Sequence, residues 1–303
     1  QTGSGKTHAL LRRGRGAESH EAGLLPRMVS ELFRRVAQDA SETGATHEIS
    51  AAALQVYNEH VDDLLRAEQQ GAEGLNLEVR RGGEVPGLTW VQCKRAETLR
   101  KVFNRARANL VYAETWMNRA SSRSHAIFQI RIARRGGGPG PCTVARLSVV
   151  DLAGSERVKK SGVEGVHLKE ATAINKSLLA LGNVVSALVA KSAHVPFRDS
   201  KLTRILDGSI GGNCKTVLLV CASSAMEHVP ETLSSLEFAA RAMDIEVNAR
   251  INAVVEFESC ARVEEEAVEE EPTLEEQLAE ALERAARAES RAEVAERSAV
   301  EWR

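Results

Sequence analysis

A glycine-rich string at the start of the chain sets the narrowest limits on what these residues can build. It runs Gly3-Ser4-Gly5-Lys6-Thr7. In this order, glycines let backbone N–H groups curl around phosphates, a lysine reaches the β- and γ-phosphates, and a threonine hydroxyl ligates Mg²⁺. One more glycine of this pattern would lie just before Gln1. Because half of the pattern is also typical of a flexible Gly/Ser turn, the string alone leaves both interpretations open.

A carboxylate follows a mainly apolar run. Residues 144–150 have the composition of a central strand that is covered on both faces, and Asp151-Leu152-Ala153-Gly154 comes directly after them. An acid at the carboxyl end of such a strand can hold Mg²⁺ through water, and the N–H of Gly154 can meet a γ-phosphate. By itself, an aspartate that caps a turn is the commoner interpretation.

A third string, residues 118–125, surrounds an arginine with hydroxyls: Asn-Arg-Ala-Ser-Ser-Arg-Ser-His. It precedes a strand-like run, so its serines can supply a Mg²⁺ ligand and orient a water. A hydrophilic loop with helix-capping serines is the alternative. Each string has an ordinary explanation, but together they supply the parts of one nucleotide site in the expected order.

Apolar periodicity divides the chain into alternating helices and strands, which predicts an α/β fold. A helix is expected near Lys6. Further helices are predicted over 24–40, 97–109, 168–189 and 231–243, and strands over 48–57, 75–80, 88–92, 126–133, 143–150 and 216–222. Glycine and proline at 82–83 and 86–87 predict turns between short strands.

Charge separates the body of the chain from its end. The net charge of −2 combines a basic body with a strongly acidic segment, residues 261–303. That segment has apolar residues at spacings of four and three, from Leu274 to Trp302, which resembles a heptad seam. Because most seam residues are alanine, a weak coiled coil and a single charged helix remain equal alternatives.

The five cysteines are scattered and form no C-x-x-C pair, which argues against a disulfide scaffold or zinc site and for a reducing compartment. No apolar run is long enough for a membrane span, so we expect no membrane insertion.

The three strings together resemble the P-loop, switch I and switch II of the kinesin motor domain. The matching residues are Gln1-Thr2-x-Ser4-Gly5-Lys6-Thr7, Asn118-x-x-Ser121-Ser122-Arg123-Ser124-His125 and Asp151-Leu152-Ala153-Gly154-Ser155-Glu156. Further matches include Asn175-Lys176-Ser177-Leu178 and residues 194–204. The resemblance extends from Gln1 to Asn252.

The resemblance implies a P-loop NTPase motor domain with three α/β/α layers and a mixed central sheet, followed by a C-terminal helix. We expect a motor domain over 1–245, a neck-linker-like segment over 246–260, and an acidic, Ala-rich helix or weak coiled coil over 261–303. The strands that precede the P-loop in kinesins are missing. We therefore expect residues 1–303 alone to show no microtubule-stimulated ATPase, and robust stimulated turnover by that chain would refute this expectation.

The resemblance also implies a role for each site residue, with ATP and Mg²⁺ as cofactors. Residues Gln1, Thr2, Gly3, Ser4, Gly5, Lys6 and Thr7 would bind nucleotide. Thr7 and Ser122 would ligate Mg²⁺ directly, and Asp151 would do so through water. Ser121 would lie near the attacking water, Gly154 would sense the γ-phosphate, and Arg123 and Glu156 would form the ion pair that closes both switches.

The implied partner is the acidic surface of the microtubule, and self-association through the C-terminal helix is a second expectation. Clustered cations would form an electrostatic contact: Lys159, Lys160, Lys176, Arg198, Lys201 and Arg204. Nucleic acid is the competing anion, but the family match decides against it, and no aromatic platform or recognition helix is seen.

The function implied is an ATP-dependent microtubule motor of the cytoplasm and cytoskeleton. A motor followed by a neck linker favours plus-end direction, and residues 241–247 are weakly similar to armadillo-repeat kinesins of plants and protists. One alternative is a microtubule-binding module with an incomplete or inactive nucleotide site. A GTPase is a third hypothesis, but no guanine-reading Asn/Thr-Lys-x-Asp string occurs. Upstream sequence that places a strand ending in glycine before Gln1 would favour the motor.

Overall fold

The structure is a computed structural model that describes residues 4–12, 22–66, 76–116, 124–136, 142–154 and 166–254. The chain divides into two compact units, Gln1–Glu264 and Glu265–Arg303. The described residues all belong to the first unit. The predicted acidic helix or weak coiled coil over 261–303 and residues 255–260 of the neck-linker-like segment lie outside the described residues.

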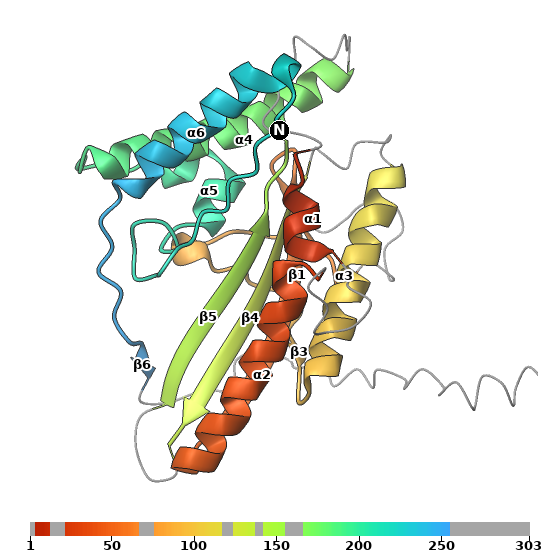
Figure 1. Ribbon diagram of the computed structural model, residues 1–303, viewed down its shortest axis with the longest axis vertical. Coiled ribbons are helices and arrows are strands. Elements are labelled where there is room, and N and C mark those ends of the chain that lie inside the picture. Colours follow the sequence, from red (N-terminus) through yellow and green to blue (C-terminus); the bar gives the residue numbers. More distant parts are fainter. Residues whose placement is uncertain are drawn as a thin grey trace, which may run out of the picture. The chain divides into compact units, whose positions relative to one another are not determined.

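A sheet forms the centre of the first unit, with the strand order β2-β1-β4-β5-β6 and β3 paired to the side of β1 (Figure 1). The strands are β1 (Thr46–Tyr57), β2 (His60–Asp63), β3 (Val91–Gln92), β4 (His125–Arg135), β5 (Cys142–Asp151) and β6 (Ala253–Val254). Every pairing among these strands is antiparallel, whereas the resemblance led us to expect a mixed sheet.

Strand β1 connects the two hydrophobic cores because its successive side chains point to opposite faces of the sheet. Ile49, Ala51 and Ala53 belong to one cluster of buried residues. Ala52 and Leu54 belong to the other. The segment 48–57 had been predicted as a strand from this alternation, and it is confirmed within β1.

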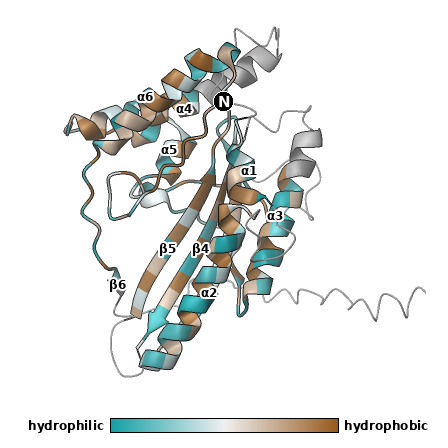
Figure 2. Cartoon of the chain, viewed as in Figure 1, coloured by the Kyte–Doolittle hydropathy of each residue, from teal (hydrophilic) through white to brown (hydrophobic). Residues whose placement is uncertain are grey.

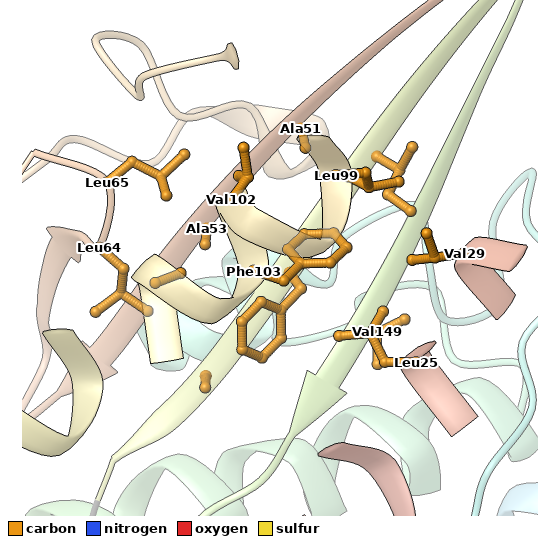
Figure 3. Close-up of a cluster of buried hydrophobic side chains, with 14 of the residues drawn as sticks. Leu25, Val29, Ala51, Ala53, Leu64, Leu65, Leu99, Val102, Phe103 and Val149 are labelled. Atoms are coloured by element: carbon orange, nitrogen blue, oxygen red, sulfur yellow. The ribbon is translucent and has the colours of Figure 1, made fainter. Parts of the chain in front are cut away.

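Three helices cover the first face of the sheet: α1 (Lys6–Leu11), α2 (Leu24–Thr43) and α3 (Ala96–Trp116). Helix α2 carries both hydrophilic and hydrophobic residues along its length (Figure 2), and its Leu25 and Val29 are buried in the first core. Figure 3 shows these two side chains with Leu99 and Phe103 of α3 against the strands. The Phe103 ring meets Phe128 of β4 edge to face, with ring centroids 5.5 Å apart.

The second face is covered from the later part of the chain, by α4 (Val166–Val189), α5 (Lys201–Ile205) and α6 (Val229–Met243). Leu181 of α4 and Leu202 of α5 are buried in the second core, and Phe238 of α6 packs against it. Helices on both faces of one sheet make the three α/β/α layers that were predicted.

Two of the predicted strands, 75–80 and 216–222, are not formed among the described residues, and a third, 88–92, is formed only in part. Residues 76–80 have no regular structure, and only Val91–Gln92 of the predicted strand 88–92 pairs, with Ser50 and Ala51. Residues 216–222 form no strand, and Val217 is 90% exposed. An apolar run becomes a strand only beside a neighbour that takes its hydrogen bonds, and among the described residues this one has none.

Strand β5 is also less buried than its composition suggested. It pairs with β4 from Thr143 to Asp151, but with β6 only at Cys142 and Thr143. Most of its residues are therefore only half-buried, whereas the sequence predicted cover on both faces.

None of the helices described in the structure combines the length and apolar composition of a membrane span.

The turn at Gly82 and Gly83 provides a matched test of local packing. Both residues have positive φ, 76° and 74°. A Cβ at Gly83 would clash with the carbonyl oxygen of Ile205, whereas a Cβ at Gly82 would meet nothing within 4 Å. We expect Gly83→Ala to lower the free energy of unfolding by about 1–3 kcal/mol more than Gly82→Ala. Chemical denaturation measures both, and equal losses would contradict the close approach to α5.

Candidate nucleotide-binding site

The glycine-rich string forms a turn that leads into a helix. Gly5 has φ 95°, ψ 13° and lies at the N-cap of α1. This left-handed conformation favours glycine, which explains why the helix begins directly after it. The Gly5 carbonyl accepts a hydrogen bond from the Ala9 N–H at 2.8 Å. Lys6 and Thr7 are thereby fixed in the first turn of α1, as predicted from the sequence.

The structure brings two of the predicted site residues together across 144 positions of sequence. The Thr7 hydroxyl donates a hydrogen bond to Asp151 Oδ2 at 2.6 Å. Asp151 is the last residue of β5 and is buried, with 8% of its surface exposed. The end of β5 and the start of α1 therefore form one site, which is the arrangement that the first two strings implied.

Electrostatics at Asp151 are set mainly by burial. Removal from water raises the pKa of the Asp151 carboxyl, while the hydrogen bond from Thr7 and the charges of Lys6 and Arg107 lower it. The net direction is upward. An additional positive charge beside this carboxylate would stabilise its ionised form.

The second oxygen of Asp151 fits the predicted Mg²⁺. Asp151 Oδ1 is buried and has no hydrogen-bond partner within the described part of the chain, although buried polar atoms are normally paired. A hydroxyl oxygen and a carboxylate oxygen side by side are ligands that Mg²⁺ prefers, often through water. The residues present therefore fit the ion that the sequence predicted.

The residues after Asp151 are held by a buried histidine. The N–H of Ala153 donates to Nδ1 of His125 at 3.1 Å. Gly154, the predicted γ-phosphate sensor, follows directly and is buried. His125 had been noted only as the end of the third string. Its place directly before the predicted strand 126–133 was the one signal in the sequence that this side chain would be buried and hydrogen-bonded.

Helix α3 contributes a contact that the sequence did not suggest. The Arg107 guanidinium donates to the carbonyl of Leu11, the last residue of α1, at 2.7 Å. The same cation lowers the pKa of Asp151. Arg107 is one of several arginines on an amphipathic helix, so no local pattern distinguished it.

Several predicted site residues lie outside the described residues. These are Gln1, Thr2, Gly3, Ser121, Ser122, Arg123, Glu156, Lys159 and Lys160. Their predicted roles stay predictions. Ser4 lies in the described turn before α1.

The remaining predicted microtubule-binding residues lie on neighbouring elements. Lys176 is exposed on α4, and Arg198 is exposed on the 3₁₀ turn Phe197–Asp199. Lys201 and Arg204 are half-buried on α5. Helix α4 packs against both α5 and this turn, so the four cations belong to one group of elements (Figure 1).

Comparison with known proteins agrees with this geometry. The sequence model of the family described as kinesin motor domain matches residues 1–245. Kinesin-related protein 2 of Dictyostelium discoideum is 40% identical over 260 residues, which cover 82% of this chain and 32% of that protein. The chain thus spans about a third of this curated relative.

Two solved structures are similar in fold. One, titled "Structure of a fast kinesin: Implications for ATPase mechanism and interactions with microtubules", has a TM-score of 0.74 and 36% identity, and the match covers 89% of this chain and 74% of that one. The other is a KIF14 dimer in a two-heads-bound state with AMP-PNP on a microtubule, with a TM-score of 0.74 and 31% identity over 83% of this chain and 71% of that one. With the Thr7–Asp151 site at the end of its central sheet, the chain belongs to the kinesin motor domain family.

Proposed function

We propose that this chain supplies the ATP-hydrolysing, microtubule-binding part of a molecular motor. The observation that carries the proposal is the contact between Thr7 and Asp151, which joins the glycine-rich turn to the end of β5. Beside it lies Asp151 Oδ1, which has no hydrogen-bond partner among the residues that the structure describes. The family match supports it, and one similar structure is titled for an ATPase mechanism and interactions with microtubules.

The chain's own residues would divide the work at the phosphates. Lys6 would bind the β- and γ-phosphates, and Thr7 and Asp151 would hold Mg²⁺ together with Ser122. Mg²⁺, when bound, neutralises charge on the phosphates. Gly154 would offer its N–H to the γ-phosphate. Arg123 and Glu156 would form the ion pair that orients the attacking water, with Ser121 beside it.

The proposed track contact is electrostatic and lies on α4 and α5. We expect Lys176→Glu to raise the microtubule concentration at half-maximal ATPase stimulation about 10-fold, because a like charge then faces an acidic surface. The matched control is Lys94→Glu, an exposed lysine in the segment between β3 and α3. Steady-state ATPase of the whole protein at two salt concentrations measures the effect, and equal shifts for both variants would contradict the assignment to α4.

The finer assignments are part of the same proposal. We infer plus-end-directed movement from the neck-linker-like segment after the motor, a location on the microtubule cytoskeleton, and self-association through residues 261–303. Gliding of polarity-marked microtubules tests the direction, and sedimentation of the acidic segment with its downstream sequence tests self-association.

The deciding experiment uses the whole protein that contains this chain. ATP turnover is measured without and with microtubules, beside the Lys6→Ala variant. Turnover that microtubules stimulate and that Lys6→Ala abolishes supports a motor. Microtubule binding without turnover would instead favour the alternative, a binding module with an inactive nucleotide site.

A further inference from the structure

One buried imidazole touches two of the elements that the proposed motor must coordinate. His125 is the first residue of β4 and is only 2% exposed. It is also the last residue of the third string, residues 118–125. None of the roles assigned so far uses this side chain.

Both ring nitrogens of His125 are engaged. Nδ1 lies 3.1 Å from the backbone nitrogen of Ala153, and Nε2 lies 2.9 Å from Oγ of Ser177. A backbone N–H can only donate, so Nδ1 is the acceptor and carries no proton. Nε2 therefore carries the ring proton and donates it to the Ser177 hydroxyl. Burial also lowers the pKa of His125 to about 4, which keeps the ring neutral near pH 7.

The two partners belong to different functional regions. Ala153 lies between Asp151, the predicted metal residue, and Gly154, the predicted phosphate sensor. Ser177 is a buried residue of α4, 3% exposed, and the residue directly before it in the chain is the exposed Lys176. One rigid ring therefore spans from the nucleotide site to the helix that carries part of the proposed track contact.

We propose that His125 is a positioning residue that couples the segment Asp151–Gly154 to helix α4. The inference rests on the proposed function for its biological meaning, but the coupling itself is a property of nucleotide binding. Because an imidazole has no rotatable bond between its two nitrogens, displacement of the Ala153 backbone must either move the ring against Ser177 or break a buried hydrogen bond. A buried donor or acceptor that loses its partner and has no access to water costs the folded state free energy. Movement at the nucleotide site is thereby passed to α4.

The test is hydrogen exchange of the whole protein, with and without MgADP, followed in peptides from α4 and in peptides that contain Asp151–Gly154. In the wild type, nucleotide is expected to change exchange in both regions, by at least about 5-fold in α4. Ser177→Ala removes the α4 hydroxyl that His125 contacts and leaves the contact of His125 with Ala153 in place. It is expected to abolish the change in α4 while the change at Asp151–Gly154 persists.

Four further variants separate coupling from simple loss of packing. His125→Asn retains an acceptor for Ala153 but not the contact with Ser177, so it should resemble Ser177→Ala, and the double variant should lose no more coupling than either one. Ser177→Thr keeps the hydroxyl and should restore the response. Ser186→Ala, an exposed serine on the same helix, is the matched control and should leave the response intact.

The outcomes distinguish this inference from the proposed function. A wild-type response in α4 that survives both Ser177→Ala and His125→Asn overturns the coupling role of His125. Absence of any response of α4 to nucleotide overturns it as well. Loss of the response in these variants supports the role even where microtubules fail to stimulate turnover, a separate result that would overturn only the motor proposal.

Discussion

Asp151→Asn is expected to lower ATP turnover by about 10–100-fold or more, the range found when a residue that holds a metal through another ligand is replaced, and at the same time to stabilise the nucleotide-free protein. Burial raises the pKa of Asp151, so at neutral pH the ionised carboxylate costs the folded state free energy. Asparagine has the same shape, accepts the Thr7 hydrogen bond and carries no charge.

The pH dependence gives this prediction a sign. A carboxyl whose pKa is raised by folding destabilises the fold above its folded-state pKa, and the cost disappears as the pH falls below its unfolded-state pKa. The advantage of Asn over Asp should therefore be greatest at neutral pH and vanish in acid. Each kcal/mol gained raises the melting temperature by about 2–4 °C in a domain of this size.

Differential scanning calorimetry without nucleotide, from pH 3 to pH 8, measures the effect. Asp62→Asn on β2 is the control, because this aspartate is only half-buried and accepts a hydrogen bond from Gln55. A lower melting temperature for Asp151→Asn at neutral pH would show that the attraction of Lys6 and Arg107 outweighs the cost of burial.

Phe128→Ala is expected to lower the free energy of unfolding by about 3–5 kcal/mol, because it leaves a cavity where a large side chain was packed. Phe128 is 1% exposed and meets the Phe103 ring edge to face. A loss of this size is a large share of the stability of a typical domain. Much of the variant should therefore be unfolded at physiological temperature.

Urea denaturation compares Phe128→Ala with Phe33→Ala, a half-buried residue of α2 that packs against the same core. We expect the Phe33 variant to lose less than half as much. Similar losses would mean that the Phe103–Phe128 pair has no special weight in this core.

The parts of the fold that depend on local pattern were predictable. Alternation identified β1, and apolar spacing identified α2 and α3, because each buries one face against the sheet. Gly5 and the glycines at 82–83 have the positive φ values that their turn predictions required. In these segments local chemistry and tertiary packing favour the same structure.

The rest depended on partners distant in the sequence. Residues 216–222 have a strand-forming composition, yet Val217 is exposed and no neighbour pairs with the segment among the described residues. In the site, Thr7 and Asp151 were predicted because each belongs to a recognisable string. Arg107 and Ser177 were not, because the first lies among other arginines and the second matters only through His125, 52 positions away.

The placement of β1 has a consequence for how the unit melts. Residues 51–54 are 0% exposed, and their side chains alternate between the core under α1 to α3 and the core under α4 and α5. Neither layer can open without exposing this strand to the other side, so both should unfold in a single cooperative transition. A ligand that binds to one layer then stabilises the whole unit. Nucleotide bound near α1 would therefore raise the temperature at which α5 unfolds, without touching α5.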